Sequence, residues 1–102
     1  MTDTEKEVLL RKMTDSLPVL RKQAGLTQNE LADLIGVSTY TVLAIEKRRR
    51  PMSWGTFLSL ILVFGKNPKT KNMLGFFGIH TPAFNQYLEC SGLEKNQPER
   101  EN

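Results

Sequence analysis

Apolar side chains recur every three or four residues along most of the chain, which is the period of an amphipathic helix. The pattern is clearest in residues 27–47, where two short apolar stripes are separated by Gly36. A glycine there predicts a tight turn between two short helices, because glycine adopts the left-handed conformation at little cost. We therefore expect an all-α protein organised around this pair.

The first helix of the pair carries signals for both of its ends. Thr27 is a favoured N-cap residue, and Glu30 follows at the spacing of a capping box, in which each side chain bonds the other residue's amide. The apolar positions that follow are Leu31, Leu34 and Ile35. These signals predict a short helix that ends at Gly36.

The second helix has a back suited to the protein interior and a front suited to a partner. Ser38 is expected to cap it. Its back carries Val37, Val42 and Ile45, and its front carries Thr39, Tyr40, Leu43, Ala44 and Lys47. A helix with an anchored back and a small, polar front can enter the major groove of DNA.

Several residues of this stretch occur together in one known motif. The first helix contributes Gln28 at its start and Ala32 within it, and the turn contributes Gly36 and Val37. The second helix contributes the Thr41–Val42 pair and the Ile45–Glu46 pair. With them, the segment GLTQNELADLIGVSTYTVLAIEKRRR resembles the helix-turn-helix of lambda-repressor-like regulators, the Cro and xenobiotic-response-element group. The resemblance covers about residues 16–75. It implies a lambda-repressor-like DNA-binding domain of about five short helices.

The resemblance also implies how such a domain works. Members of this family commonly bind as homodimers to operators with two-fold symmetry, whose half-sites lie roughly 34 Å apart. The protein is therefore expected to be a homodimeric regulator of transcription that binds double-stranded DNA, with repression as its output. Its charged N-terminus lacks the apolar core of a signal peptide, which predicts a cytoplasmic location.

Roles for the charged residues near the pair follow from the same resemblance. In this family a basic residue at the position of Arg21 pairs with the glutamate at the position of Glu46. The loop after the second helix runs along the DNA backbone, which implies phosphate contacts from Lys47, Arg48, Arg49 and Arg50. The family usually has a glycine in this loop, where Arg48 and its neighbours stand here. The amides at Ser53 and Trp54, where a further helix begins, are expected to meet another phosphate.

The remaining contacts are assigned from the chemistry of the front. We expect base pairs to be read by Thr39, Tyr40, Leu43 and Ala44, and the backbone to be contacted also by Gln28 and Ser38. None of the four base-reading residues is Arg, Asn or Gln, so the front offers no bidentate contact to a base. We therefore expect modest specificity that favours thymine. Burial of Leu43 against a C-terminal helix is the alternative role for that residue, and Trp54 is expected to cover the core rather than to stack on bases.

Charge and composition agree with a nucleic-acid partner and give no sign of catalysis. Between Asp15 and Asn72 there are nine Lys and Arg residues against four Asp and Glu residues, which suits a polyanion. Cys90 and His80 are the only residues of their types, so the sequence offers no zinc-binding cluster and no catalytic motif. We expect no enzymatic activity, no metal, no cofactor and no membrane-spanning segment.

The flanks of the pair predict further helices. An amphipathic helix is expected over residues 3–13, either packed on the domain or serving as a partner-binding arm, and a separate helix capped by Asp15 or Ser16 is expected to follow, with Pro18 in its first turn. Later helices are expected over residues 54–65, 69–77 and 81–90. The chain then divides into an N-terminal accessory helix (1–14), the DNA-binding domain (15–79), a C-terminal helical extension (80–93) and a disordered tail (94–102).

Two other classes of protein fit the same sequence. An antitoxin would bind DNA and hold a second protein with its added ends, and the apolar segment 73–79 either completes the core or forms a surface shared with another chain. A pure interaction module would keep the fold without binding DNA. The three consecutive arginines argue against the second class.

Overall fold

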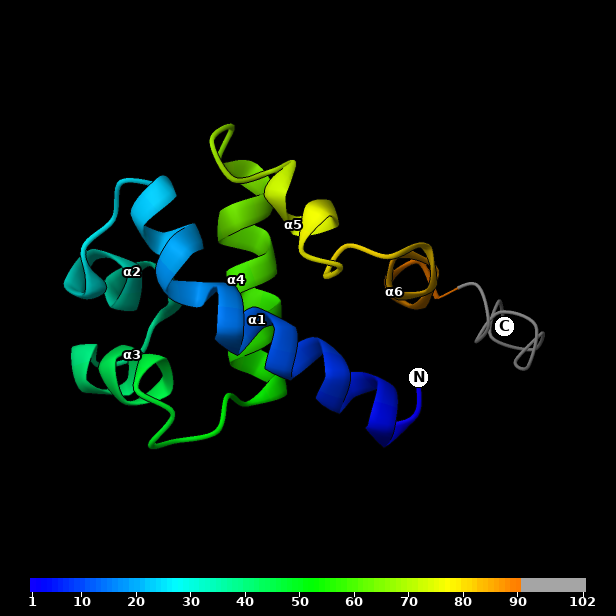
Figure 1. Cartoon of the computed structure of the whole chain (residues 1–102), viewed down its shortest axis with the longest axis horizontal. Helices are drawn as coiled ribbons and strands as arrows, with labels where there is room; N and C mark the ends of the chain where they lie inside the picture. Colours follow the sequence, from blue (N-terminus) through cyan, green and yellow to red (C-terminus); the bar gives the residue numbers. More distant parts are fainter. Residues whose placement is uncertain (91–102) are drawn as a thin grey trace, which may run out of the picture.

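The computed structural model describes residues 1–90, and over that range it contains helices and no strand (Figure 1). The helices are α1 (Asp3–Gln23), α2 (Gln28–Ile35), α3 (Thr39–Glu46), α4 (Trp54–Lys66), α5 (Met73–Phe76) and α6 (Pro82–Leu88). The all-α prediction is confirmed for this range. The tail predicted over 94–102 and the last residues of the predicted extension lie outside the described residues.

α1 is a single helix of 21 residues where the sequence predicted two. Its N-cap is Thr2, whose hydroxyl accepts a hydrogen bond from the Glu5 amide, while the Glu5 carboxylate accepts one from the Thr2 amide. The Thr2 amide that donates to the carboxylate, followed by the Thr2 hydroxyl, lowers the pKa of Glu5 below its ordinary value. The prediction that Asp15 or Ser16 caps a new helix is wrong, because the chain stays helical through both.

The physical reason lies in the buried stripe of α1, which crosses the predicted break without interruption. Leu9, Met13, Leu17 and Leu20 are all buried and follow one another at intervals of three or four residues. Pro18 lies inside the helix and removes one backbone hydrogen bond, a change that costs about 3 kcal/mol in an isolated helix. Burial of large apolar side chains on both sides of Pro18 offsets that cost, since each contributes about 1.5–3 kcal/mol.

The central pair of helices forms as predicted. Thr27 and Glu30 make a complete capping box at the start of α2. Gly36 has a φ of 76°, and the Val37 amide bonds the Ala32 carbonyl across the turn. α2 then packs against α3, and both lie at one end of the molecule (Figure 1).

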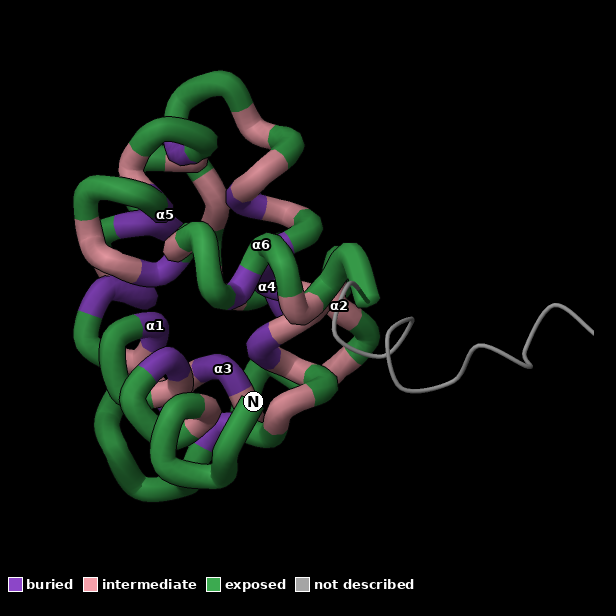
Figure 2. Tube along the Cα trace, turned by 90° about the vertical axis from the view of Figure 1, so that its right-hand side faces the viewer, coloured by how far each residue is buried: buried purple, intermediate pink, exposed green. Residues whose placement is uncertain are grey.

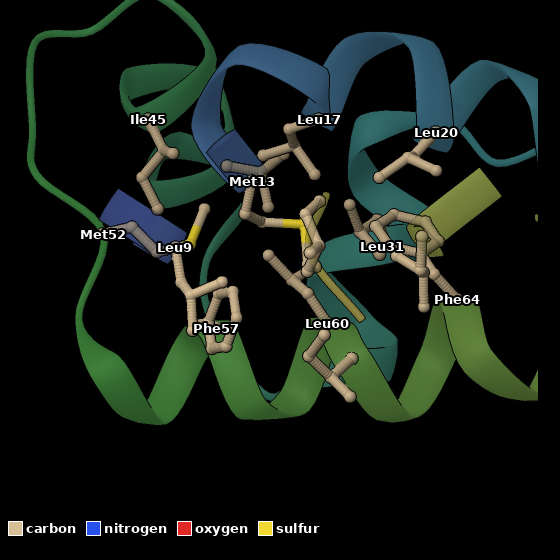
Figure 3. Close-up of a cluster of buried hydrophobic side chains, with 14 of the residues drawn as sticks. Leu9, Met13, Leu17, Leu20, Leu31, Ile45, Met52, Phe57, Leu60 and Phe64 are labelled. Carbon is tan, nitrogen blue, oxygen red and sulfur yellow. The ribbon is translucent and has the colours of Figure 1, made fainter. Parts of the chain in front are cut away.

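The core lies between α1 and α4. Figure 3 shows the apolar side chains of α1 facing Phe57, Leu60 and Phe64 of α4, with Leu31 of α2 and Ile45 of α3 in the same cluster. The buried parts of α1, α3, α4 and α5 accordingly turn inward, while exposed residues form the outside of the chain (Figure 2). α1 and α4 therefore form the core against which the α2–α3 pair packs.

The C-terminal part of the described chain closes the opposite end of the core. α5 is shorter than the predicted helix over 69–77, and its Leu74 is buried. Thr70, in the turn before α5, is also buried, and its hydroxyl donates to the Phe64 carbonyl at 2.7 Å. α6 forms within the predicted range 81–90, with Thr81 as its N-cap and Phe84 in the interior.

Candidate nucleic-acid interface

α3 presents an exposed front beside a buried back. Thr39 and Tyr40 are exposed at its start, and the Tyr40 side chain retains 65% of its accessible surface. Leu43 is half-buried, and Lys47 is exposed at the end of the helix. The buried side chains of α3 are Val42, Ala44 and Ile45. The helix is therefore anchored from behind, with its N-terminal residues directed outward.

Ala44 is a correction to the predicted front. Only 3% of its surface is accessible, so the prediction that it contacts base pairs is wrong. Ala44 lies roughly 140° around the helix from Thr39, at the boundary between the two faces. A methyl group fits either face, and the hydrophobic pattern alone therefore did not distinguish them.

One residue of the exposed surface was missed by the sequence interpretation. Asn29 is exposed in the first turn of α2, and its side-chain carbonyl accepts a hydrogen bond from the Thr39 hydroxyl at 2.7 Å. Its amide group remains a donor beside the front of α3. The signal in the sequence was its position next to Gln28, since the start of α2 and the start of α3 come together in this motif.

A polar cluster formed by Arg21, Gln28 and Glu46 joins three helices behind this surface. Arg21 Nε lies 2.7 Å from Glu46 Oε2, and the side chains are only 11% and 7% exposed. Gln28 Nε2 donates to Glu46 Oε1 at 2.9 Å, and Arg21 Nη1 donates to the Leu26 carbonyl at 3.0 Å. The structure thus brings Arg21 and Glu46 together. The side-chain amide of Gln28, which was expected to contact a phosphate, already donates one hydrogen bond to Glu46.

The turn after α3 has the hydrogen bonds of the turn after α2, with an arginine in place of the glycine. Arg48 has a φ of 60°, its amide bonds the Ile45 carbonyl, and the Arg49 amide bonds the Ala44 carbonyl. This is the Schellman arrangement, in which a left-handed residue ends the helix. The loop therefore keeps the geometry that a glycine would give it.

The side chains of this loop point in different directions. Arg48 turns back to α1, where its Nη2 lies 2.6 Å from Asp15 Oδ1, whereas Arg50 donates to the Thr41 hydroxyl of α3 at 2.8 Å. Lys47 and Arg49 are exposed and make no side-chain hydrogen bond within residues 1–90. The predicted basic cluster is thus exposed throughout, but two of its members already have partners in the protein.

The backbone amide and the ring of Trp54, at the start of α4, have different environments. Ser53 caps the helix, with its hydroxyl accepting from the Thr56 amide, so the amides of Trp54 and Gly55 precede the first helical hydrogen bond. The Trp54 ring instead stacks on Phe57 at 4.8 Å. Its amide can meet an anion, while its ring belongs to the core.

The exposed α3 front, the basic loop beside it and the capped α2–α3 turn define a helix-turn-helix protein of the DNA-binding class. A family model described as a helix-turn-helix domain matches residues 15–67, just over half of the chain, and the chain belongs to this family. The domain occurs in regulators of the Cro and xenobiotic-response-element group, which places the protein among DNA-binding regulators. Comparisons with curated proteins and with solved structures returned no match.

No helix within residues 1–90 combines the length and the apolar character needed to cross a membrane. Over the same residues, no three His, Cys, Asp or Glu side chains gather where they could hold a metal ion.

Proposed function

We propose that the protein is a cytoplasmic transcriptional regulator that binds specific sequences of double-stranded DNA with α3 in the major groove, and that it acts as a repressor without enzymatic activity. The observation that supports this most directly is the arrangement of α3. Its back is buried through Val42 and Ile45, its N-terminal residues Thr39 and Tyr40 are exposed, and basic side chains follow at its end.

Sequence is read, in this proposal, by the outer residues of α3 together with α2. Tyr40 donates a hydrogen bond to a purine acceptor or lies against the backbone, and Leu43 contacts a thymine methyl group. Thr39 and Asn29 already share a hydrogen bond, so they meet the groove as a unit and leave the Asn29 amide as the donor. The front remains without Arg, and discrimination between sequences is modest for each half-site.

The backbone contacts come from groups that surround this front. Lys47 and Arg49 are exposed beside it, and the amides of Trp54 and Gly55 offer an anion site at the start of α4. The Ser38 hydroxyl accepts from the Thr41 amide as the cap of α3, and in this proposal it donates its own proton to a phosphate. These contacts carry no sequence information and account for most of the salt dependence.

The regulator is proposed to act as a homodimer, because a single modest half-site needs a second one for useful specificity. Phe76 on α5 retains 86% of its accessible surface, which supports α5 as a contact between two chains. A second protein bound at the same surface, as in an antitoxin, is the alternative. Sedimentation of the protein alone distinguishes them, since the homodimer requires a mass of two chains and Phe76→Ser should reduce it to one.

Selection of binding sites from random duplexes with the purified protein is the main test. The expected result is a two-fold symmetric site whose half-sites are spaced by about one helical turn. Retention of all duplexes to the same extent at low salt, with no enriched sequence, would contradict sequence-specific regulation. Failure to retain any duplex would exclude DNA binding altogether.

A further inference from the structure

A hollow of about 340 Å³ lies between α1 and the loop that joins α3 to α4. α1 contributes Arg11 and Thr14, and the loop contributes Arg48, Arg49, Arg50 and Pro51. Four arginines thus contribute to the lining of one hollow, with the Arg48 guanidinium turned to Asp15 and that of Arg50 turned to Thr41. Arg11 precedes the region that the helix-turn-helix family model matches, so the family does not assign it a role.

The α1 side of the hollow is a single patch of the helix surface. Arg11, Thr14 and Asp15 stand at positions i, i+3 and i+4, which are neighbours on a helix. The Thr14 hydroxyl donates to the Leu10 carbonyl at 2.8 Å, so its proton is already used within α1. The donors that this side offers to a ligand are therefore those of Arg11.

The charges around the hollow are only partly balanced. Arg48 pairs with Asp15, and both side chains are well exposed, at 62% and 49%. Arg50 bonds a neutral hydroxyl, that of Thr41. Arg11 and Arg49 make no ion pair or side-chain hydrogen bond within residues 1–90. Guanidinium groups present paired donors that match the oxygens of a phosphate.

We propose that this hollow binds a phosphate group, that Arg11 of α1 holds it together with the loop arginines, and that Asp15 competes with the phosphate for Arg48. Two sources supply this chemistry. One is a backbone phosphate of a bound duplex, in which case the inference rests on the proposed function. The other is a free oligophosphate, which needs no DNA binding. In both cases the carboxylate of Asp15 occupies the position on Arg48 that the phosphate takes.

The first arm of the test measures binding to an arbitrary duplex as a function of salt. Arg11→Ala should reduce the magnitude of the negative slope of log affinity against log salt by about one unit. Arg11→Lys should keep the slope while weakening binding, because lysine retains the charge and loses the paired donors. The matched control is Lys69→Ala, which removes the same charge from an exposed residue beyond the far end of α4. Its slope should stay that of the wild type.

Asp15 is tested in the same assay. Asp15→Asn removes the competitor and should raise duplex affinity by about two- to fivefold, the range that an exposed ion pair supports. Glu89→Gln makes the same change of charge on an exposed residue after α6 and should raise it less. Equal effects of the two substitutions would remove Asp15 from the proposal.

The second arm uses tripolyphosphate without DNA. Amide resonances of residues 11–15 and 48–50 are followed by NMR during titration of the wild type and of Arg11→Ala. Shifts that the variant abolishes, with an unchanged salt slope for duplex, assign the hollow to a free oligophosphate, and a changed slope assigns it to DNA. If neither arm responds to Arg11→Ala, the hollow is not a phosphate site. Tripolyphosphate binding by a wild type that retains no duplex would overturn the proposed function and leave the phosphate site standing.

Discussion

The two ends of the molecule are stabilised by different kinds of interaction. At the helix-turn-helix end, the polar cluster of Arg21, Gln28 and Glu46 joins α1, α2 and α3 through charged hydrogen bonds. At the other end, an aromatic cluster formed by Trp54, Phe57, Phe84 and Tyr87 joins α4 and α6, and the Lys6 ammonium group of α1 lies 5.1 Å from the Trp54 ring.

The difference follows from what each end has to do. Charged hydrogen bonds are directional, so the polar cluster fixes the angle at which α3 is held. Aromatic side chains bury large areas, so the aromatic cluster closes the core between α4 and α6. The first end therefore fixes the orientation of α3, and the second end buries apolar surface.

The largest expected effect comes from removing one partner of the buried ion pair. Glu46→Ala leaves the Arg21 guanidinium buried without its counter-charge, and the free energy of unfolding should fall by about 3–5 kcal/mol. Urea denaturation followed by circular dichroism measures it. A double variant, Arg21→Met with Glu46→Leu, should recover most of the loss. A loss under 1 kcal/mol for Glu46→Ala alone would mean that water reaches Arg21.

A somewhat smaller loss is expected at the aromatic end. Phe84→Ala should lower the free energy of unfolding by about 3 kcal/mol, near the bottom of the range for a buried phenylalanine, because α6 can detach without unfolding the remaining core. Leu62→Ala is the control, since that side chain is exposed on α4 rather than on α5. Hydrogen exchange should show loss of protection in α6 first. Simultaneous loss in α2 and α3 would contradict the separation of the two ends.

Changes on the front of α3 should affect recognition and leave stability almost untouched. Tyr40→Ala should reduce discrimination among selected duplexes by about 1–3 kcal/mol. Competition binding with the preferred site and single-base variants measures this. Leu34→Ala, at an exposed position of α2, serves as the comparison. An equal loss for every duplex would transfer Tyr40 from the base-reading set to the backbone set.

The smallest effect concerns the arginine that ends α3. Arg48→Gly relieves a left-handed conformation that costs a non-glycine residue about 1–2 kcal/mol, and it also removes the exposed pair with Asp15, worth about 0.2–1 kcal/mol. The expected balance is a stability gain of about 0.5 kcal/mol, since glycine adds unfolded-state entropy. Thermal unfolding should detect a slightly raised midpoint. A lowered midpoint would show that the Asp15 pair contributes more than the strain.

The parts predicted from sequence are those governed by local signals. The capping box of Thr27 and Glu30 and the Gly36 turn each depend on residues within a few positions of one another, and each forms as expected. The Arg21–Glu46 pair spans 25 positions and was accessible only through the family resemblance. Local signals also misled at Pro18, where a helix start was inferred and long-range burial kept the helix continuous.

What could not be predicted depends on contacts between distant segments. Nothing in the sequence near Lys6 indicates that it lies over the rings of Trp54 and Tyr87, because three separate helices must first come together. The partner of Arg48 was hidden for the same reason, since Asp15 was assigned to a cap instead. Side-chain direction within a charged run is set by such partners and not by the run itself.

The unbroken course of α1 changes what a shortened chain would be. Deleting residues 1–14 removes Leu9 and Met13, two buried side chains of the core, together with the Thr2–Glu5 capping box that begins the helix. The first fourteen residues thus supply about half of one continuous helix, whose C-terminal end carries Arg21. A protein shortened to the helix-turn-helix motif would therefore hold α3 less firmly, although the deleted residues lie far from α3 in the sequence.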